Sequence, residues 1–211
     1  EKIKALGVET ILHSNDSGIA EQHAQKLAKE QGKIYVSPYN DPQIIAGQGT
    51  LAIELLDQLP RLDVVYVSIG GGGLISGIGS VLKAFSPKTR VVGVSAKNSA
   101  ELAASIRAGK MVKVDHHETL ADGCAGGVDS DTITLGLGSE VIDDLIDCSE
   151  GQIESGLQQI AWSEKMLVEG SAGLAYAAWQ EDARKNKNKI SAVVLCGANF
   201  DKETLSPIFN S

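Results

Sequence analysis

Four consecutive glycines, Gly70 to Gly73, are the residues of this sequence that most directly indicate chemistry. They follow an apolar, β-branched run at 64–69 and precede a helix-like stretch that begins at Leu74. Because glycine has no Cβ, such a loop can turn sharply and bring several backbone N–H groups toward one anion, beside the positive end of the helix. We therefore predict a phosphate-binding loop. The alternative is a glycine-rich turn that only lets the strand and the helix pack closely.

Two common phosphate-binding motifs do not fit this loop. A nucleoside triphosphate P-loop ends in Gly-Lys followed by Ser or Thr, whereas Gly73 is followed here by Leu74 and Ile75. A dinucleotide site requires the pattern G-x-G-x-x-G and an acidic residue after the next strand, but the strand expected at 90–95 is followed by Ala96. We therefore expect a phosphate-bearing ligand from outside these two nucleotide classes.

The elements around the loop must position it, and strand-like and helix-like stretches alternate along the chain. Such alternation is typical of an α/β fold in which an open parallel sheet carries helices on both faces. Strands are expected at 10–13, 33–36, 64–69, 90–94 and 191–196. A helix to Glu30 is expected after an N-cap at Asp16 or Ser17, and further helices are expected at 47–59, 74–85, 100–108, 132–145, 151–166 and 171–186. The glycine-containing stretch 111–127 is expected to be a loop that lines a site.

Length, charge and cysteine content exclude several other classes of protein. A chain of 211 residues with 43% hydrophobic content can bury a sizeable core. The 19 basic and 27 acidic residues give a net charge of −8 without a basic cluster, so we expect a small-molecule partner rather than nucleic acid or a membrane. Cys124, Cys148 and Cys196 have no paired spacing, which predicts no disulfide framework, no metal site and a reducing, cytoplasmic location.

Five segments carry motifs that are weak singly and specific as a set. They read Asp-Pro followed by Ile-Ala-Gly-Gln-Gly-Thr (41–50), Gly-Gly-Gly-Gly-Leu (70–74), Thr-Leu-Ala-Asp-Gly (119–123), Val-Glu-Gly-Ser-Ala-Gly (168–173) and Leu-Cys-Gly-Ala-Asn (195–199). In order and approximate spacing they resemble the serine/threonine dehydratase family of pyridoxal-phosphate enzymes, which includes threonine and serine ammonia-lyases and serine racemase. The resemblance covers essentially the whole chain.

The resemblance implies a fold and a division into domains. The family has the second major fold of pyridoxal-phosphate enzymes (fold type II), which is similar to the tryptophan synthase β chain. In this fold, an open, twisted parallel sheet with helices on both faces binds the cofactor, and a smaller α/β domain lies beside it. We therefore expect residues 41–211 to form the large cofactor-binding domain, and residues 1–40 to be the C-terminal remnant of the small domain.

The resemblance also implies roles for individual residues. The glycine loop would hold the phosphate of pyridoxal 5'-phosphate, and Gly123 would lie against the face of its ring. Cys196 would face the pyridine nitrogen, and Glu169 would be a carboxylate near the cofactor. The expected cofactor-binding residues are thus Gly70, Gly71, Gly72, Gly73, Leu74, Gly123, Glu169 and Cys196.

Each of these residues also has a plainer interpretation from its position alone. Cys196 could be a buried thiol at the end of a strand, and Gly123 an ordinary loop glycine. Glu169 could be a charge partner for the start of a helix. Asn199 could steady the loop after Cys196 or be only a turn residue. If Cys196 does face the ring, its thiol, with an ordinary pKa of about 8.5, holds the nitrogen protonated less well than a carboxylate of about 4, which favours elimination.

Two departures from the family limit the resemblance. The family's cofactor-binding lysine lies in a Ser-Phe/Tyr-Lys-x-Arg-Gly segment, and none of the 15 lysines here has those neighbours. The loop that binds the substrate carboxylate is absent too. Both lie upstream in the family, so the chain is expected to be the C-terminal two-thirds of an enzyme, to contain no catalytic residue and to be inactive alone. Ser95 stands where many relatives have a metal-binding Glu, so no metal is expected, although Glu101 is nearby.

The resemblance implies that the intact protein dehydrates and deaminates a β-hydroxy amino acid, threonine or serine, to a 2-oxo acid and ammonia. Racemisation of serine or another amino acid is the alternative within the class. A phosphate-ligand binding module without chemistry is the alternative outside it. The expected partners are an amino-acid substrate and further copies of the chain, in a homodimer or homotetramer.

Overall fold

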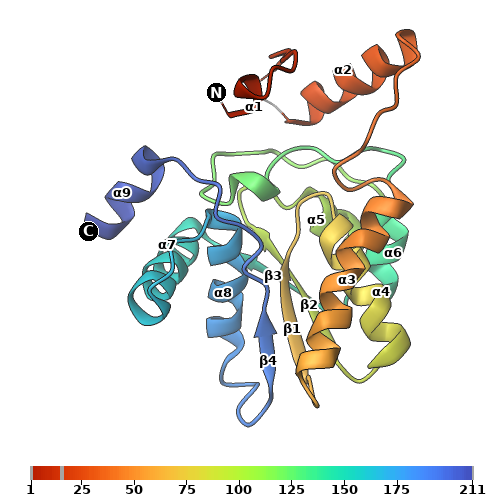
Figure 1. Ribbon diagram of the computed structural model, residues 1–211. Helices are drawn as coiled ribbons and strands as arrows, with labels where there is room; N and C mark the ends of the chain where they lie inside the picture. Colours follow the sequence, from red (N-terminus) through yellow and green to blue (C-terminus); the bar gives the residue numbers. More distant parts are fainter. Residues whose placement is uncertain (1, 15–16, 211) are drawn as a thin grey trace.

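The core of the protein is a four-stranded, wholly parallel sheet, seen in a computed structural model that describes residues 2–14 and 17–210 (Figure 1). The strand order among the described residues is β3-β2-β1-β4. The strands are β1 (Val64–Ser68), β2 (Arg90–Ala96), β3 (Asp144–Cys148) and β4 (Ser191–Val193). All five residues of β1 are buried, which explains why this strand reads as a continuous apolar run in the sequence.

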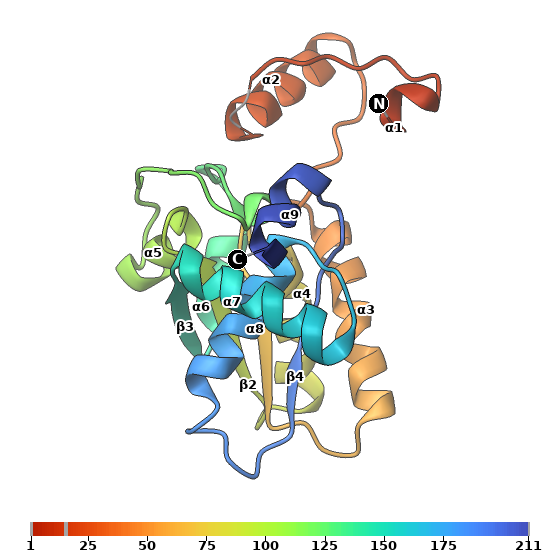
Figure 2. The same ribbon diagram turned by 90° about the vertical axis from the view of Figure 1, so that its left-hand side faces the viewer.

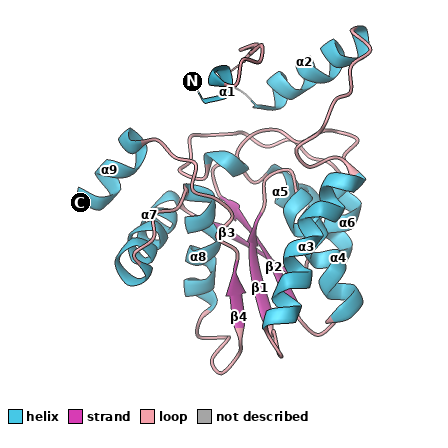
Figure 3. Cartoon of the chain, viewed as in Figure 1, coloured by secondary structure: helices cyan, strands magenta, loops and turns pink. Residues whose placement is uncertain are grey.

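Helices cover both faces of this sheet (Figure 3). One face packs against α3 (Pro42–Gln58), α4 (Gly73–Phe85), α5 (Glu101–Ala108) and α6 (Thr134–Val141). The other face packs against α7 (Glu150–Gln159), α8 (Gly170–Asp182) and α9 (Lys202–Asn210). A π-helical turn, Ile160–Glu164, extends α7. This arrangement confirms the predicted α/β class.

The start of α3 lies five residues earlier than the sequence pattern predicts, for a local reason. The side chain of Asp41 accepts hydrogen bonds from the backbone N–H groups of Gln43 (2.7 Å) and Ile44 (3.2 Å), and Pro42 occupies the first helical position. An acidic cap followed by proline is a favourable helix start, because proline has no N–H to leave unpaired there.

The prediction of two N-terminal strands is wrong. Segments 10–13 and 33–36 are loop residues without a hydrogen-bonded partner strand in the described part of the chain. Leu12 is 87% exposed and Ile34 is 92% exposed, so neither segment has the sheet face that its apolar residues require. The helices α1 (Lys2–Ala5) and α2 (Ser17–Glu30) flank these segments, above the carboxyl ends of the strands (Figure 2). Asp16, one of the two expected caps of α2, lies outside the described residues.

The predicted helix at 132–145 is wrong in its second half, where β3 was missed. The backbone N–H of Asp143 donates to the carbonyl of Val91 (2.9 Å), and the Asp143 carboxylate accepts from the N–H of Val91 (2.8 Å). Lys83 also binds this carboxylate, at 2.7 Å. These tertiary bonds end the helix at Val141 and direct the chain into the sheet, against its local periodicity.

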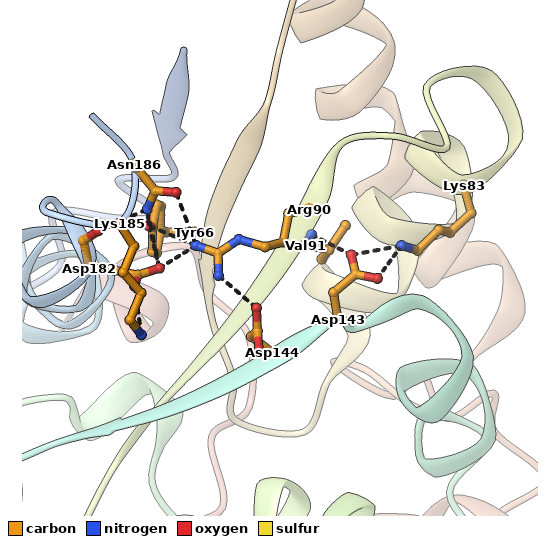
Figure 4. A network of polar contacts seen from close by, with 9 residues as sticks. All are labelled: Tyr66, Lys83, Arg90, Val91, Asp143, Asp144, Asp182, Lys185 and Asn186. Atoms are coloured by element: carbon orange, nitrogen blue, oxygen red, sulfur yellow. Dashed lines mark hydrogen bonds and ion pairs between the residues drawn. The ribbon is translucent and has the colours of Figure 1, made fainter. Parts of the chain in front are cut away.

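A network of charged side chains around the buried Asp182 joins the elements at the end of the sheet opposite the strand carboxyl ends (Figure 4). The Arg90 guanidinium donates to Asp144 (2.7 Å) and to the buried Asp182, which also accepts from the hydroxyl of Tyr66 (3.0 Å) and from Lys185 (3.1 Å). Burial alone would raise the pKa of Asp182, but these hydrogen bonds outweigh it and lower the pKa to about 2. The network therefore ties α8 to the sheet.

Candidate functional site

The glycine loop and Cys196 come together because they follow neighbouring strands. Gly70 is two residues beyond the end of β1, Cys196 is three residues beyond the end of β4, and β1 and β4 are paired from Val64 with Ser191 to Tyr66 with Val193. Parallel strands carry both segments to the same edge of the sheet, where ligands bind in open α/β folds. A cavity of about 430 Å³ lies there. It is lined by residues 17, 21, 38, 39, 68, 70–74, 122–127, 169, 171 and 196.

The glycine loop has the hydrogen-bonding groups of an anion site. It leads directly into α4, and Gly72 has a φ of 87°, which favours glycine. Among the described residues, no backbone hydrogen-bond acceptor is recorded for the N–H groups of Gly70 to Leu74, whereas the carbonyl of Gly71 accepts from Thr134 Oγ1 (2.7 Å). Unpaired donors at the positive end of a helix favour a negatively charged ligand.

The same glycines are also required by packing behind the loop. A Cβ on Gly71 would overlap the ring of Tyr39, and a Cβ on Gly72 would overlap the side chain of Leu102. A Cβ on Gly73 would lie 2.9 Å from the Cα of Tyr39. The glycines are therefore needed for close packing against Tyr39 and Leu102 as well as lining the cavity.

Two thiols line this cavity. Cys196 is an exposed residue that lines the cavity, and desolvation by the neighbouring protein atoms, followed by the nearby Cys124 and Glu169, raises the pKa of its thiol to about 12. Burial raises the pKa of Cys124 to about 11. Both thiols are consequently neutral near pH 7, and neither carries the negative charge that a carboxylate would bring to the same place.

Glu169 orders the loop that follows Cys196. It precedes α8 without capping that helix through its side chain. Its Oε2 accepts from the backbone N–H of Asn199 (2.9 Å), and its own N–H donates to the carbonyl of Gly197 (3.1 Å). A Cβ on Gly197 would overlap the Glu169 carboxylate. Glu169 thus lines the cavity and also holds residues 197–199 through main-chain contacts.

Gly123 lies beside Ser171 and Glu169 in the cavity lining, in a short 3₁₀ turn, Asp122–Cys124. A Cβ on Gly123 would lie 3.0 Å from Ser171 Oγ and 3.4 Å from Glu169 Oε1, so the walls carrying these three residues are close together. All eight residues expected from the sequence to bind the cofactor, including Gly123, therefore line one cavity.

Tyr39 and Ser171 line the same cavity and were missed as single residues. The Tyr39 hydroxyl accepts from the backbone N–H of Asp129 (2.8 Å), which joins two walls. Ser171 is 1% exposed, and its hydroxyl lies beside the thiol of Cys124, whose pKa it lowers against the larger effect of burial. Ser171 belongs to segment 168–173, so a search for hydroxyl groups within the matched motifs would have found it. Nothing in the sequence around Tyr39 indicates its contact with the glycine loop.

The charged residues of the cavity lining are all acidic. Within the described part of the chain, Glu21, Asp122 and Glu169 line the cavity and no Lys, Arg or His does. Burial, followed by the charge of Asp129, raises the pKa of Glu21. No group of three or more metal-ligating side chains lies together in residues 2–14 and 17–210. In the same residues, no helix is long and apolar enough to cross a membrane.

A family model described as pyridoxal-phosphate dependent enzyme matches residues 1–197. The chain belongs to this family. It is 34% identical over 209 residues to an L-threonine ammonia-lyase of Thermotoga maritima, and the match covers 99% of this chain and 52% of that protein. This chain thus spans about half the length of that relative. The match confirms the resemblance and the dependence of the family on pyridoxal phosphate.

Solved structures of this family have the same fold. The processed form of threonine deaminase isoform 2 from Solanum lycopersicum superimposes with a TM-score of 0.88 at 29% identity, over 99% of this chain and 61% of that chain. Maize serine racemase superimposes with a TM-score of 0.85 at 28% identity, over 97% of this chain and 64% of that one. The family's relatives therefore include both deaminases and racemases.

Proposed function

We propose that the cavity binds pyridoxal 5'-phosphate through the residues that the sequence motifs indicate. The N–H groups of Gly70 to Leu74 would hold the phosphate, Gly123 would leave room for the ring, and Cys196 would face the ring nitrogen. The observation that carries this proposal is the row of backbone donors without a recorded backbone acceptor at the start of α4, in the same cavity as Gly123 and Cys196. The family match supports the identity of the ligand.

We propose further that the protein to which this chain belongs deaminates a β-hydroxy amino acid, threonine or serine, to a 2-oxo acid and ammonia. When bound, pyridoxal phosphate supplies an electron sink for the bond that breaks at the substrate's α-carbon. The chain's contribution is a neutral thiol at Cys196, whose high pKa keeps an extra negative charge away from the ring nitrogen. The similarity to an L-threonine ammonia-lyase supports this substrate class.

Amino-acid racemisation is the second candidate, because maize serine racemase has the same fold and racemisation shares the loss of the α-proton with deamination. The acidic lining does not distinguish the two reactions, since Glu21, Asp122 and Glu169 would line the cavity in either case. A module that binds a phosphate ligand without chemistry is the third candidate, and the missing lysine in the cavity lining favours it for the chain alone.

The group that takes the α-proton is proposed to come from outside the cavity lining described above. No lysine of the described residues lines the cavity, so we expect the chain alone to bind the ligand and to be inactive as a lyase. The division into domains 1–40 and 41–211, the assembly as a homodimer or homotetramer and the cytoplasmic location also stay proposals.

The decisive assay uses the longest natural form of the protein that contains this chain. It is incubated with pyridoxal phosphate and L-threonine or L-serine, and the 2-oxo acid, ammonia and D-amino acid are quantified. Steady release of 2-oxo acid and ammonia supports the proposal, and a dominant D-amino acid product supports the racemase. If pyridoxal phosphate binds but neither 2-oxo acid nor D-amino acid forms, the result supports the binding module.

A further inference from the structure

A buried carboxylate lies directly behind one wall of the cavity. Glu101 begins α5, and its side chain is 1% exposed. Its Oε1 accepts from Lys113 Nζ (3.0 Å) and from the backbone N–H of Val128 (3.0 Å), and its Oε2 contacts His116 Nε2 (3.1 Å). Because a carboxylate only accepts hydrogen bonds, Nε2 of His116 carries the proton of that contact.

The hydrogen bonds continue from His116 to the chain in front of it. His116 Nδ1 lies 2.7 Å from Ser99 Oγ, and Ser99 Oγ accepts from the backbone N–H of Gly126 (3.0 Å). Ser99 is 4% exposed. Two N–H groups of loop 122–129 therefore donate to this network, that of Gly126 to Ser99 and that of Val128 to Glu101. They leave that loop little freedom to move independently of α5.

Loop 122–129 is part of the candidate site. Residues 122–127 line the cavity, and on the far side the N–H of Asp129 donates to the Tyr39 hydroxyl. The loop is thus fastened at one side by Glu101 and at the other by the residue that packs against the glycine loop. A displacement of a few tenths of an ångström would change the space in front of Gly123.

The charge of Glu101 is compensated locally. Burial alone would raise the pKa of Glu101, but the bonds from Val128, Lys113 and His116 outweigh it, and the pKa lies below its ordinary value. The Lys113 side chain is 74% exposed. Lys113 therefore contributes a positive charge at Glu101 and little buried apolar surface, which makes it a suitable residue for separating electrostatics from packing.

We propose that Glu101 is a positioning residue of the candidate site. Through Val128 it holds loop 122–129 against the glycine loop, Lys113 neutralises its charge, and His116 links it through Ser99 to the N–H of Gly126. The ordering of the loop stands on these contacts alone. Its effect on ligand binding rests on the proposed function.

The test compares amide hydrogen exchange in Glu101→Gln, Lys113→Met and Lys113→Arg with the unmodified chain. Glu101→Gln preserves size and removes the charge, so we expect exchange in peptide 122–129 to become about tenfold faster while the peptide of β1 keeps its protection. Lys113→Met should also speed exchange in peptide 122–129, to a smaller degree. Lys113→Arg keeps the positive charge and should leave the protection unchanged. Glu118→Gln, an exposed acid on the same segment, is the matched control.

Unchanged exchange at 122–129 in Glu101→Gln would overturn the proposal, and so would an equal loss of protection in β1, which indicates a general structural role. The affinity for pyridoxal 5'-phosphate is measured on the same samples, and we expect it to fall about tenfold in Glu101→Gln. If the unmodified chain binds none, the proposed function fails while the exchange data still decide the role of Glu101.

Discussion

A Cβ on Gly71 would overlap the ring of Tyr39, so the glycine loop after β1 rests directly on the residue that leads into α3. The hydroxyl of the same ring accepts from the N–H of Asp129, at the end of loop 122–129. One aromatic side chain therefore connects two walls of the cavity. Tyr39 thus shapes the site both as a lining residue and through these two contacts.

Replacing Gly71 with alanine should damage both stability and ligand binding. The new methyl group must displace the Tyr39 ring, which we expect to lower the free energy of unfolding by about 1 to 3 kcal/mol. Gly47→Ala is the control, because Gly47 lies inside α3 with nothing within 4 Å of the added Cβ. That change should raise the free energy of unfolding by roughly 0.5 to 1 kcal/mol. The free energy of unfolding of both variants is measured in urea, and equal changes in the two would contradict the predicted overlap with the Tyr39 ring.

Removing the Glu169 carboxylate should loosen the loop after Cys196. Glu169→Ala leaves the N–H of Asn199 without its acceptor, so we expect faster amide exchange in peptide 196–200 and weaker binding of pyridoxal 5'-phosphate, by about tenfold. The exposed acid Glu181, inside the helix α8 that follows Glu169, provides the control, Glu181→Ala. If both variants bind alike, Glu169 does not order the site.

The charge network of Figure 4 predicts a pH dependence of stability. The pKa of Asp182 is about 2 in the folded protein against an ordinary value of 3.8, so the unfolded chain binds the proton more tightly. Its contribution is therefore fully present well above pH 4 and is lost as the pH falls from about 4 toward 2. Urea unfolding at pH 7, 4 and 3 should show this loss.

Asp182→Asn tests the origin of that pH dependence. At pH 7 it should cost about 3 kcal/mol, because Arg90 loses its buried counter-charge, and at pH 3 the cost should be smaller. Glu54→Gln, an exposed acid on α3, should change neither value. A constant cost at all pH values would mean that the carboxyl charge of Asp182 is unimportant.

The sequence predicted the site better than it predicted the edges of the fold. Gly70 to Gly73 and Cys196 could be brought together from sequence because both follow buried strands of a parallel sheet. Strand β3 could not be predicted from the sequence, because the hydrogen bonds between Asp143 and Val91 that end the preceding helix join residues 52 positions apart. The pairing of Glu101 with Lys113 and His116 is equally invisible, since it depends on how a loop folds back over α5.

The lysines of this chain should not react with the ligand. Reduction with borohydride in the presence of pyridoxal phosphate, followed by peptide mass mapping, should give no stoichiometrically labelled lysine, because none of the described lysines lines the cavity. Lys165 and Lys97, which lie near the matched segments, are the positions to inspect first. One fully labelled lysine with steady release of 2-oxo acid would show that the chain is catalytically complete.

The most direct test of the phosphate site compares the Kd of the chain for pyridoxal 5'-phosphate and for pyridoxal, measured by calorimetry with inorganic phosphate as competitor. The N–H groups of Gly70 to Leu74 can recognise only the phosphate, so pyridoxal should bind at least about a hundredfold more weakly, as expected from two or more charge-assisted hydrogen bonds. Inorganic phosphate should compete, and Gly71→Ala should remove the preference. Equal affinity for the two compounds, unaffected by phosphate, would contradict the site proposed here.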